Sequence, residues 1–383
     1  MSWLIPTGTL ILGAVAGVLG ERALGRPLDR FFTAMAERRR RRRMLRENRN
    51  YAIEGETILI ADHRIFVAQF SSAGFRRTDL LCSILPKTDI RTLVSNSASR
   101  EYITDIADLE SEVERWSRQL EADPVQWNGA KAGLNELHIS RTPVDEDPIL
   151  SMRFQRSDQA RFVATGNLWR TILKTYPGYS SRDSLPQVNP LFSQSFGLNA
   201  TVETADGKVI LARRGSRTSA WHGKWHISVN EGIQGNDATA NELDLLAVLI
   251  RGINEELGID LRTLDSPERF VTVHTLMLDV DRYEWGLLAH VDLSGTDWSE
   301  AEVNVARTQG GARDSWEATE LRFLPFGDSK GVLQECANAD EWIPHGLLNL
   351  VSSAVIRHER DASELRRALS STSGHRGGSR TSG

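Results

Sequence analysis

The most constraining stretch of this chain spans residues 225–260 and reads WHISVNEGIQGNDATANELDLLAVLIRGINEELGID. It begins with a strand-like run that turns at Glu231 and Gly232, continues through a polar loop, and ends in a helix that stops at Gly258. Apolar residues recur along this helix at spacings of three and four, which predicts that one of its faces is buried. They are Leu246, Ile250, Ile253 and Leu257.

The other face of the same helix carries Arg251, Glu255 and Glu256. Two carboxylates about 4 to 6 Å apart repel each other by about 3 to 4 kcal/mol at an effective dielectric constant near 20. A guanidinium group or a bound Mg²⁺ (or Mn²⁺) ion relieves this repulsion, and Mg²⁺ commonly binds together with substrate phosphates. We therefore expect a site for a divalent metal ion and a diphosphate at Glu255 and Glu256.

Residues 251–259, RGINEELGI, resemble the second half of the signature of the Nudix hydrolases, Arg-Glu-aliphatic-x-Glu-Glu-x-Gly-aliphatic. Eight of the nine positions agree, and the exception is Gly252, where the family has Glu. Gly232 corresponds to the opening glycine of the signature. The loop that follows it is longer than in the family, and Glu242 and Asp244 bracket the place of the first family glutamate.

The resemblance covers residues 190–357 and implies a Nudix-like α/β/α sandwich with a mixed sheet. It implies a hydrolase of the pyrophosphohydrolase type, which cleaves the diphosphate of a nucleoside diphosphate derivative with Mg²⁺ or Mn²⁺. Glu255 and Glu256 would be metal ligands and catalytic residues. Arg251 would hold the glutamates through charge-assisted bonds, and Gly258 would end the helix in a left-handed conformation.

The glycine at position 252 leaves alternatives open, because the glutamate it replaces is a metal ligand and, in some members of the family, the general base. Glu317 stands in a late loop where the family can place an acidic ligand, with Asp314 and Glu320 as neighbours of the same chemistry, and would preserve turnover. Alternatively, the pocket binds a nucleotide without cleaving it and acts as a sensor or scaffold. Isomerase chemistry on a diphosphate ranks last, because neither cysteine lies where such a site would need an acid.

Four further residues are expected to bind the substrate. Arg213 and Arg214 end a predicted strand and would meet a phosphate, although arginines at a strand end are often solvated. Glycine inside a helix costs about 1 kcal/mol relative to alanine, so a close approach of backbone or ligand would account for Gly252. Gly232 completes the set.

The N-terminal region predicts a membrane anchor. Residues 3–20, WLIPTGTLILGAVAGVLG, are uncharged, and as a helix they would span about 27 Å, close to the thickness of a bilayer core. We expect a single-pass anchor at residues 3–24; a cleaved signal sequence and a helix packed on the protein are the alternatives. Gly13 and Gly17 form a GxxxG pair that would allow two anchors to form a homodimer.

Residues 25–50 are rich in arginine, including the six consecutive residues from Arg38 to Arg43. Basic residues that follow an apolar span place the bulk of the chain on the cytoplasmic side of the cell membrane. The arginines next to an anchor are expected to contact anionic lipid, at about 1 kcal/mol per residue, rather than nucleic acid.

The rest of the chain is expected to form two domains and a tail. Residues 51–182 predict a small α/β domain of unknown role, with strands near 57–70 and 149–154 and helices near 103–120 and 162–176. A segment rich in Ser, Pro and Gly precedes residue 190. Within residues 190–357, Asp206 and Gly207 predict a hairpin turn. Residues 362–383 are expected to be a disordered tail.

The two cysteines, Cys82 and Cys336, lie far apart and match no spacing of a disulfide framework or a zinc site. We therefore expect a reducing compartment and no zinc.

Overall fold

Two mixed β-sheets organise the part of the chain that the computed structural model describes, residues 55–372 without 98, 104–105, 124–127, 143–146, 177–186, 217–219, 235 and 240. The expected anchor at 3–24, the arginine-rich segment at 25–50 and the end of the tail lie outside these residues. Among the described residues, no helix has both the length and the apolar character needed to cross a membrane.

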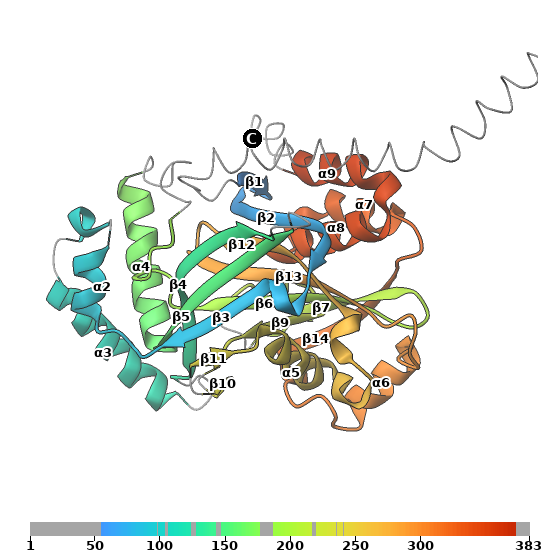
Figure 1. Ribbon diagram of the computed structural model, residues 1–383, viewed down its shortest axis with the longest axis horizontal. Helices are drawn as coiled ribbons and strands as arrows, with labels where there is room; N and C mark the ends of the chain where they lie inside the picture. Colours follow the sequence, from blue (N-terminus) through green and yellow to red (C-terminus); the bar gives the residue numbers. More distant parts are fainter. Residues whose placement is uncertain are drawn as a thin grey trace, which may run out of the picture. The chain divides into compact units, whose positions relative to one another are not determined.

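The larger sheet has nine strands and contains one parallel pair, β13 with β6, while its other pairs are antiparallel. Two short strands extend it off the main path, β8 beside β7 and β9 beside β6. In spatial order the main strands are β1 (Glu56–Ile60), β2 (His63–Phe75), β12 (Val271–Asp279), β13 (Glu284–Asp292), β6 (Phe196–Glu203), β7 (Lys208–Arg214) and β14 (Ala318–Pro325), with β8 (Trp225–Ile227) and β9 (Val229–Gly232) beside them (Figure 1).

The smaller sheet has five strands and is also mixed, because β3 and β5 are parallel and the other pairs are antiparallel. Its spatial order is β10 (Ala238–Thr239), β11 (Glu242–Leu243), β3 (Leu80–Leu85), β5 (Pro148–Asp158) and β4 (Ala130–Arg141). The described chain is therefore a mixed α/β structure.

Each sheet contains strands that precede residue 182 in the sequence and strands that follow residue 190, so the expected domain boundary does not separate the sheets. The hairpin of β1 and β2 extends the larger sheet through the pairing of β2 with β12, and β10 and β11 extend the smaller sheet through the pairing of β11 with β3. The described parts of the segments expected as separate domains, 51–182 and 190–357, thus share both sheets and belong to one compact unit.

Helices cover both faces of the larger sheet. On one face, α8 (Pro344–Arg357) packs with α7 (Lys330–Ala337) and α9 (Ala362–Ser371) in a core that includes Leu211 and Leu288. On the other face, α5 (Leu245–Leu257) packs in a second core with β6, β13 and the smaller sheet. Figure 1 shows α5 and α8 on opposite sides of the strands. The remaining helices are α2 (Ile90–Asn96), α3 (Ile106–Ala122), α4 (Gln159–Thr175) and α6 (Glu300–Thr308).

Several local predictions agree with the structure. The hairpin turn lies between β6 and β7, and Gly207 has a φ of +72°, a conformation that glycine adopts without strain. The helices predicted near 103–120 and 162–176 are α3 and α4. Residues 362–371, expected in the tail, instead form α9, because Leu365 and Leu369 are buried against α7 and α8.

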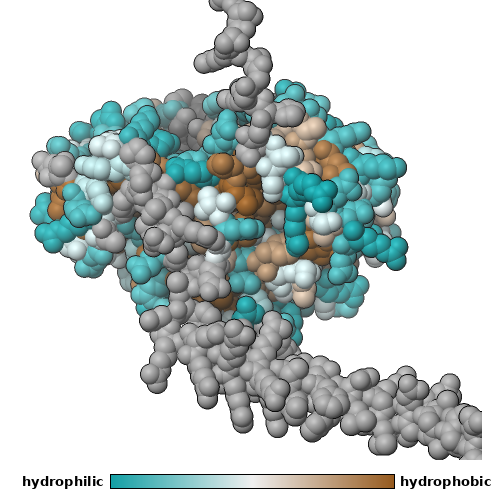
Figure 2. Space-filling model, turned by 90° about the horizontal axis from the view of Figure 1, so that it is seen from above, coloured by the Kyte–Doolittle hydropathy of each residue, from teal (hydrophilic) through white to brown (hydrophobic). Residues whose placement is uncertain are grey.

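On the face of the molecule shown in Figure 2, many of the described residues are hydrophilic, in line with a chain of which 25% is charged. In the face shown in Figure 2, hydrophobic residues gather in a few separate patches. The large hydrophobic side chains that are exposed come from different elements: Leu59, Leu81, Tyr176, Val305 and Trp316.

Candidate functional site

Helix α5 carries the predicted site residues and has well-defined ends. At its start, the side chain of Asp244 accepts hydrogen bonds from the backbone N–H groups of Leu246 and Ala247, at 3.1 and 3.3 Å. At its end, Gly258 has a φ of +76° and its N–H donates to the carbonyl oxygen of Asn254. The predicted left-handed end of the helix is therefore confirmed. The predicted apolar face is buried as well, at Leu246, Ile250, Ile253 and Leu257.

Gly252 lies directly against the side chain of Glu231, which comes from β9. A Cβ atom built on Gly252 would be 2.8 Å from Cβ of Glu231, 2.9 Å from its Cγ and 3.0 Å from its Oε2. Real Cβ atoms essentially never make carbon contacts this short. The place where the helix lacks a side chain is thus filled by a glutamate from the neighbouring strand.

Three carboxylates form a cluster at this end of α5, which we call the carboxylate cluster: Glu231, Glu256 and Glu317. Burial raises the pKa of Glu256 well above its usual value, and the charges of Glu317 and Glu231 raise it further. The backbone N–H of Asn230 donates to Oε1 of Glu256 at 2.9 Å and opposes this rise. Glu317 ends a 3₁₀ turn, Ser315–Glu317, directly before β14. The charge of Glu317, at the end of this turn, therefore acts on Glu256.

The pKa values of the other two carboxyl groups of the cluster, Glu231 and Glu317, are also raised. Burial raises the pKa of Glu231 to about 7, although the Arg251 guanidinium lowers it in part. Burial also raises the pKa of Glu317, against the effect of Arg214. Carboxylates that are buried and close together hold protons more tightly, because two negative charges cost more free energy there than in water.

Arg251 ties the helix to the loop that follows β9. Its Nη2 and Nε lie 3.0 and 3.1 Å from the two carboxylate oxygens of Asp237, and its Nη1 lies 2.7 Å from Oε2 of Glu255. Its Nη2 also lies 3.4 Å from Oε1 of Glu231 and 3.4 Å from the carbonyl oxygen of Gly232. Arg251 and Gly232 are therefore in contact, as members of one hydrogen-bonded network.

Glu255 belongs to this ion-pair network, and its charge also raises the pKa of Glu231. One of its oxygens accepts from Arg251, and the other accepts from Nη2 of Arg313. Its side chain is only 11% exposed. Both oxygens that the sequence assigned to a metal ion are thus engaged by guanidinium groups.

The two candidate phosphate-binding arginines of β7 have different surroundings. Nη1 of Arg214 lies 3.8 Å from Oε2 of Glu317, and its buried Nε has no hydrogen-bond partner among the described residues. Arg213 is exposed; its Nη1 lies 3.5 Å from Oε2 of Glu320, and its guanidinium lies 5.7 Å from the centre of the Trp225 ring. The structure therefore brings Arg214, but not Arg213, to the carboxylate cluster.

A further cation comes from the smaller sheet. Burial lowers the pKa of Lys131, on β4, while the charges of Glu284, Glu231 and Glu317 raise it in part. Its Nζ lies 5.5 Å from the centre of the Phe162 ring. Arg214 therefore lies beside the carboxylate cluster, whereas Lys131 interacts most strongly with Glu284 and only more weakly with Glu231 and Glu317.

No formed metal centre is visible in the described part of the chain: no three or more His, Cys, Asp or Glu side chains there are arranged to hold an ion. Cys82 and Cys336 are free thiols.

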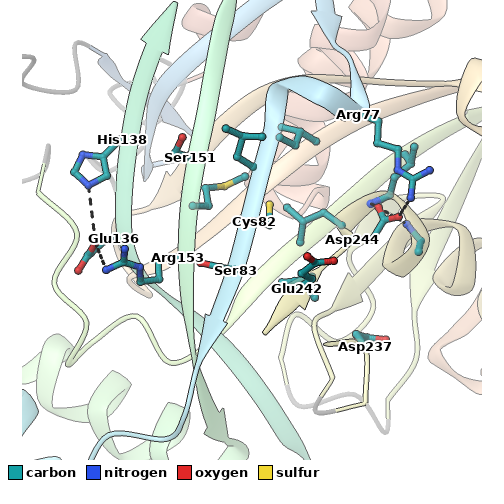
Figure 3. A pocket seen from close by; sticks show the side chains of 17 residues that line it. Arg77, Cys82, Ser83, Glu136, His138, Ser151, Arg153, Asp237, Glu242 and Asp244 are labelled. Atoms are coloured by element: carbon teal, nitrogen blue, oxygen red, sulfur yellow. Dashed lines mark hydrogen bonds and ion pairs between the residues drawn. The ribbon is translucent and has the colours of Figure 1, made fainter. Parts of the chain in front are cut away.

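A groove of about 690 Å³ lies beside the N-terminal half of α5 and does not include the carboxylate cluster. The smaller sheet forms one wall with Cys82, Ser151 and His138, and Asp237 and Asp244 lie on the side of α5 (Figure 3). Arg77 pairs with Asp244 across this groove. Since Asp237 also binds Arg251, the groove adjoins the ion-pair network.

Sequence reasoning gave no role to Glu231, Asp237 or Lys131. In the sequence, Glu231 is simply the residue before Gly232, and Asp237 is one acidic residue in a polar loop. Neither position indicates a contact with helix α5. Lys131 lies 120 residues before Arg251 in the sequence, so no local pattern connects the two.

Comparisons with known proteins do not identify a family. No protein-family model matches the chain. No curated protein matches it either. The similar solved structures include the crystal structure of DR0079 from Deinococcus radiodurans, with a TM-score of 0.28 and 13% sequence identity over 46% of this chain and 83% of that chain.

Proposed function

We propose that this chain is a Nudix-type hydrolase that cleaves the diphosphate of a nucleoside diphosphate derivative with Mg²⁺ or Mn²⁺. The observation that carries the proposal is the carboxylate cluster at the end of α5, where burial and the charges of Glu317 and Glu231 raise the pKa of Glu256. The resemblance of residues 251–259 to the Nudix signature supports it. The placement of α5 and α8 on opposite faces of a mixed sheet supports a Nudix-like sandwich.

The carboxylate cluster supplies the type of donor that the proposed metal ion would need, but its three side chains are not arranged around one ion in the described part of the chain. Carboxylate oxygens are the ligands that Mg²⁺ prefers, and a cation would relieve the repulsion by Glu317 and Glu231 that adds to the effect of burial on the pKa of Glu256. Glu256, Glu317 and Glu231 are the proposed ligands. A bound Mg²⁺ ion would supply Lewis-acid polarisation of a phosphoryl oxygen.

The remaining residues have positioning and binding roles in this proposal. Arg214 and Lys131 would hold phosphate oxygens, because the charge of Glu317 acts on both and Arg214 keeps a buried N–H without a partner in the described structure. Glu255 would act through Arg251, which it holds at 2.7 Å. Arg251 would in turn hold the loop after Gly232 in place by its two bonds to Asp237.

The cellular context of the proposal rests on the sequence of residues 3–50. We propose a single-pass anchor at 3–24, contact of the residues from Arg38 to Arg43 with anionic lipid, and a cytoplasmic catalytic part. Dimerisation through the anchor remains a prediction.

Two observations favour a second candidate function, a sensor that binds a nucleotide without cleaving it. The helix lacks the glutamate at position 252, and both oxygens of Glu255 are engaged by Arg251 and Arg313. Two of the three glutamates expected for catalysis on the helix would then be missing or occupied.

A cleavage assay with the full chain separates the two candidates. The panel contains nucleoside diphosphate sugars, ADP-ribose, dinucleotides and nucleoside triphosphates, each with and without Mg²⁺, and chromatography measures nucleoside monophosphate. We expect Mg²⁺-dependent cleavage that Glu256→Gln abolishes without unfolding the protein.

The matched control is Glu320→Gln, because Glu320 is exposed and pairs with Arg213 away from the cluster. This variant should cleave at the wild-type rate. Nucleotide binding without cleavage would favour the sensor, and full activity of Glu256→Gln would remove Glu256 from the mechanism.

A further inference from the structure

We propose that the N-terminus of helix α8 binds a phosphate group that keeps a proton, either free phosphate or the phosphate of a nucleotide. The site lies outside the carboxylate cluster and needs neither a metal ion nor turnover, so the inference goes beyond the proposed hydrolysis. It rests on buried polar atoms of His226, Asp279 and His345 that have no hydrogen-bond partner among the described residues.

The start of α8 presents free backbone N–H groups. The helix begins beside strand β8, because the N–H of Ile343 donates to the carbonyl oxygen of Trp225 at 2.9 Å. No side chain caps this end, and Pro344 at the first helical position has no N–H. The N–H groups of His345 and Gly346 therefore have no acceptor among the described residues. Such an end attracts anions, and α8 is 14 residues long, so its dipole adds to the attraction.

The side chain of His345 lies at this end and offers a further donor. Side chains of a helix lean towards its N-terminus, and His345 is the second helical residue. It is 6% exposed, and its buried Nδ1 has no hydrogen-bond partner in the described structure. Burial lowers the pKa of His345 to about 3, so its imidazole is neutral and has one N–H to donate. Buried polar atoms are nearly always hydrogen-bonded, which points to a ligand at Nδ1.

His226, on β8, packs against the same turn of α8. A Cβ atom on Gly346 would lie 3.0 Å from Cδ2 of His226, so glycine leaves room for the imidazole. Nδ1 of His226 lies 3.1 Å from the carbonyl oxygen of Ile227, and in this contact the nitrogen must donate. Burial holds the pKa of His226 well below its usual value, so the ring is neutral. Its buried Nε2 is therefore an acceptor, and it has no partner among the described residues.

Asp279, at the end of β12, supplies a second acceptor. Its Oδ2 lies 3.9 Å from Nδ1 of His345 and has no hydrogen-bond partner in the described part of the chain. Its Oδ1 accepts from Nε2 of His63 at 2.7 Å and from the N–H of Arg282 at 3.1 Å. The carboxylate is 1% exposed and is held by these two bonds. One of its oxygens is thus engaged, and the other is available to a ligand.

Arg214 adds positive charge to the site and connects it with the carboxylate cluster. Ala212 of β7 is paired with His226, and Arg214 lies two residues further on, on the same side of the strand pair. Its buried Nε has no hydrogen-bond partner among the described residues, and its charge acts on both His226 and His345. A guanidinium here offsets the negative charge of Asp279 towards an anion.

This combination of donors and acceptors selects the ligand. The helix N–H groups and Nδ1 of His345 donate, which favours an oxyanion. Asp279 and His226 accept, which requires that the oxyanion carry a proton of its own. A phosphate group keeps such a proton near neutral pH, because its second pKa is about 6, whereas sulfate has lost both of its protons. We therefore expect the site to prefer phosphate to sulfate.

Calorimetric titration of the full chain with inorganic phosphate and with sulfate, in EDTA at a pH of about 6, tests the inference without metal or turnover. Phosphate should bind at least about tenfold more tightly than sulfate, because sulfate leaves a buried carboxylate oxygen unpaired. His345→Leu should weaken phosphate binding at least about tenfold, since a hydrogen bond to a charged group contributes about this much. In Asp279→Asn, whose amide can donate, the two anions should bind within about threefold of each other.

His290→Gln is the matched control. His290 is 5% exposed and also has ring nitrogens without a hydrogen-bond partner among the described residues. It lies at the other end of α8, where its Nε2 is 3.2 Å from Glu203, and Nε of Arg357 is 3.4 Å from the same carboxylate. This variant should bind phosphate as the wild type does. Circular dichroism and urea unfolding establish that each variant is folded.

The source of the phosphate is determined by competition with AMP. Displacement of inorganic phosphate by AMP, lost in His345→Leu, would assign the site to the phosphate of a nucleotide. Phosphate binding that AMP does not disturb would assign it to free phosphate. Both results support the site at the N-terminus of α8.

Other outcomes would overturn the inference. Absence of phosphate binding by the wild type would do so, and so would wild-type affinity in folded His345→Leu. Equal affinity of the wild type for phosphate and sulfate would exclude the roles of Asp279 and His226 as acceptors, and this comparison needs no substitution. Phosphate binding that depends on His345, in a protein that cleaves nothing in the nucleotide panel, would refute the proposed hydrolysis and leave the inference standing.

Discussion

The side chain of Glu231 occupies the space that any side chain at position 252 would need. The nearest contact of a Cβ atom on residue 252 would be 2.8 Å, to Cβ of Glu231. Any side chain at position 252 would therefore force a shift of Glu231 or of the helix, and this favours glycine there despite its cost to the helix.

This relationship predicts that Gly252→Ala has opposite effects in two backgrounds. In the wild type it should lower the free energy of unfolding by up to about 2 kcal/mol, because overpacking costs about 1 to 3 kcal/mol and the gain in helix propensity is only about 1 kcal/mol. In Glu231→Gly the same change should raise the free energy of unfolding by about 1 kcal/mol. Urea denaturation measures both values.

Gly166→Ala is the control for this prediction. Gly166 lies inside α4, and a Cβ atom there would meet nothing within 4 Å. The change should stabilise the protein by about 1 kcal/mol in either background. Equal effects of Gly252→Ala in both backgrounds would contradict the proposed exclusion.

The ion-pair network of Arg251 predicts a large loss of stability in Arg251→Met. The side chain of Arg251 is 21% exposed and faces three carboxylates, so its removal leaves buried negative charge without a partner. We expect the free energy of unfolding to fall by about 3 kcal/mol. In the control, Arg262→Met, the ion pair with Asp260 is exposed, and the change should be below about 1 kcal/mol. Similar urea midpoints for the two variants would refute the assigned role.

Two buried histidines predict a loss of stability in acid. Burial lowers the pKa of His274 and that of His345 to about 3. Below pH 6.5 the unfolded chain takes up protons that these folded histidines do not, so stability falls as the pH falls from 6.5 towards 3. The slope is about 1.4 kcal/mol per pH unit for each histidine, or about 2 kcal/mol each between pH 6.5 and 5.

The measurement compares urea unfolding at pH 6.5 and 5 for the wild type and for His274→Gln/His345→Gln. The variant should lose less stability over this interval than the wild type. His138→Gln is the control, because the side chain of His138 is 76% exposed, and it should follow the wild type. Equal losses in all three proteins would contradict the prediction.

Helix α9 predicts that the C-terminal segment contributes to the core. Leu365 is fully buried against the helices on one face of the larger sheet. Leu365→Ala should lower the free energy of unfolding by about 3 kcal/mol, since it leaves a cavity. Leu81→Ala, at an exposed leucine, should change it by less than about 0.5 kcal/mol. An unchanged thermal midpoint for Leu365→Ala would mean that residues 362–371 do not pack as described.

Local elements were predictable wherever a residue pattern has a local cause. The hairpin turn at Gly207 and the end of α5 at Gly258 follow from the freedom of glycine to adopt positive φ. The buried face of α5 follows from its apolar spacing. Strands β3 and β4 were not predicted, because a strand is stabilised mainly by packing against distant neighbours.

The candidate site, too, has features that the sequence predicts and features that depend on distant residues. The charged face of α5, with Arg251, Glu255 and Glu256, is visible in nine consecutive residues. The different roles of Glu255 and Glu256 are not visible there. They depend on Arg313, which lies 58 residues beyond Glu255 and donates a hydrogen bond to its second carboxylate oxygen.

The sequence by itself determined the helix, its ends and the charges on its exposed face, because these follow from interactions between residues a few positions apart. Only the tertiary structure decided which carboxylates act on one another. Strand pairing of β9 with β6 brings Glu231 onto Gly252, and the turn before β14 places Glu317 where its charge acts on Glu256. The physical reason is that hydrogen bonding between distant strands sets these positions, and spacing along one helix carries no record of it.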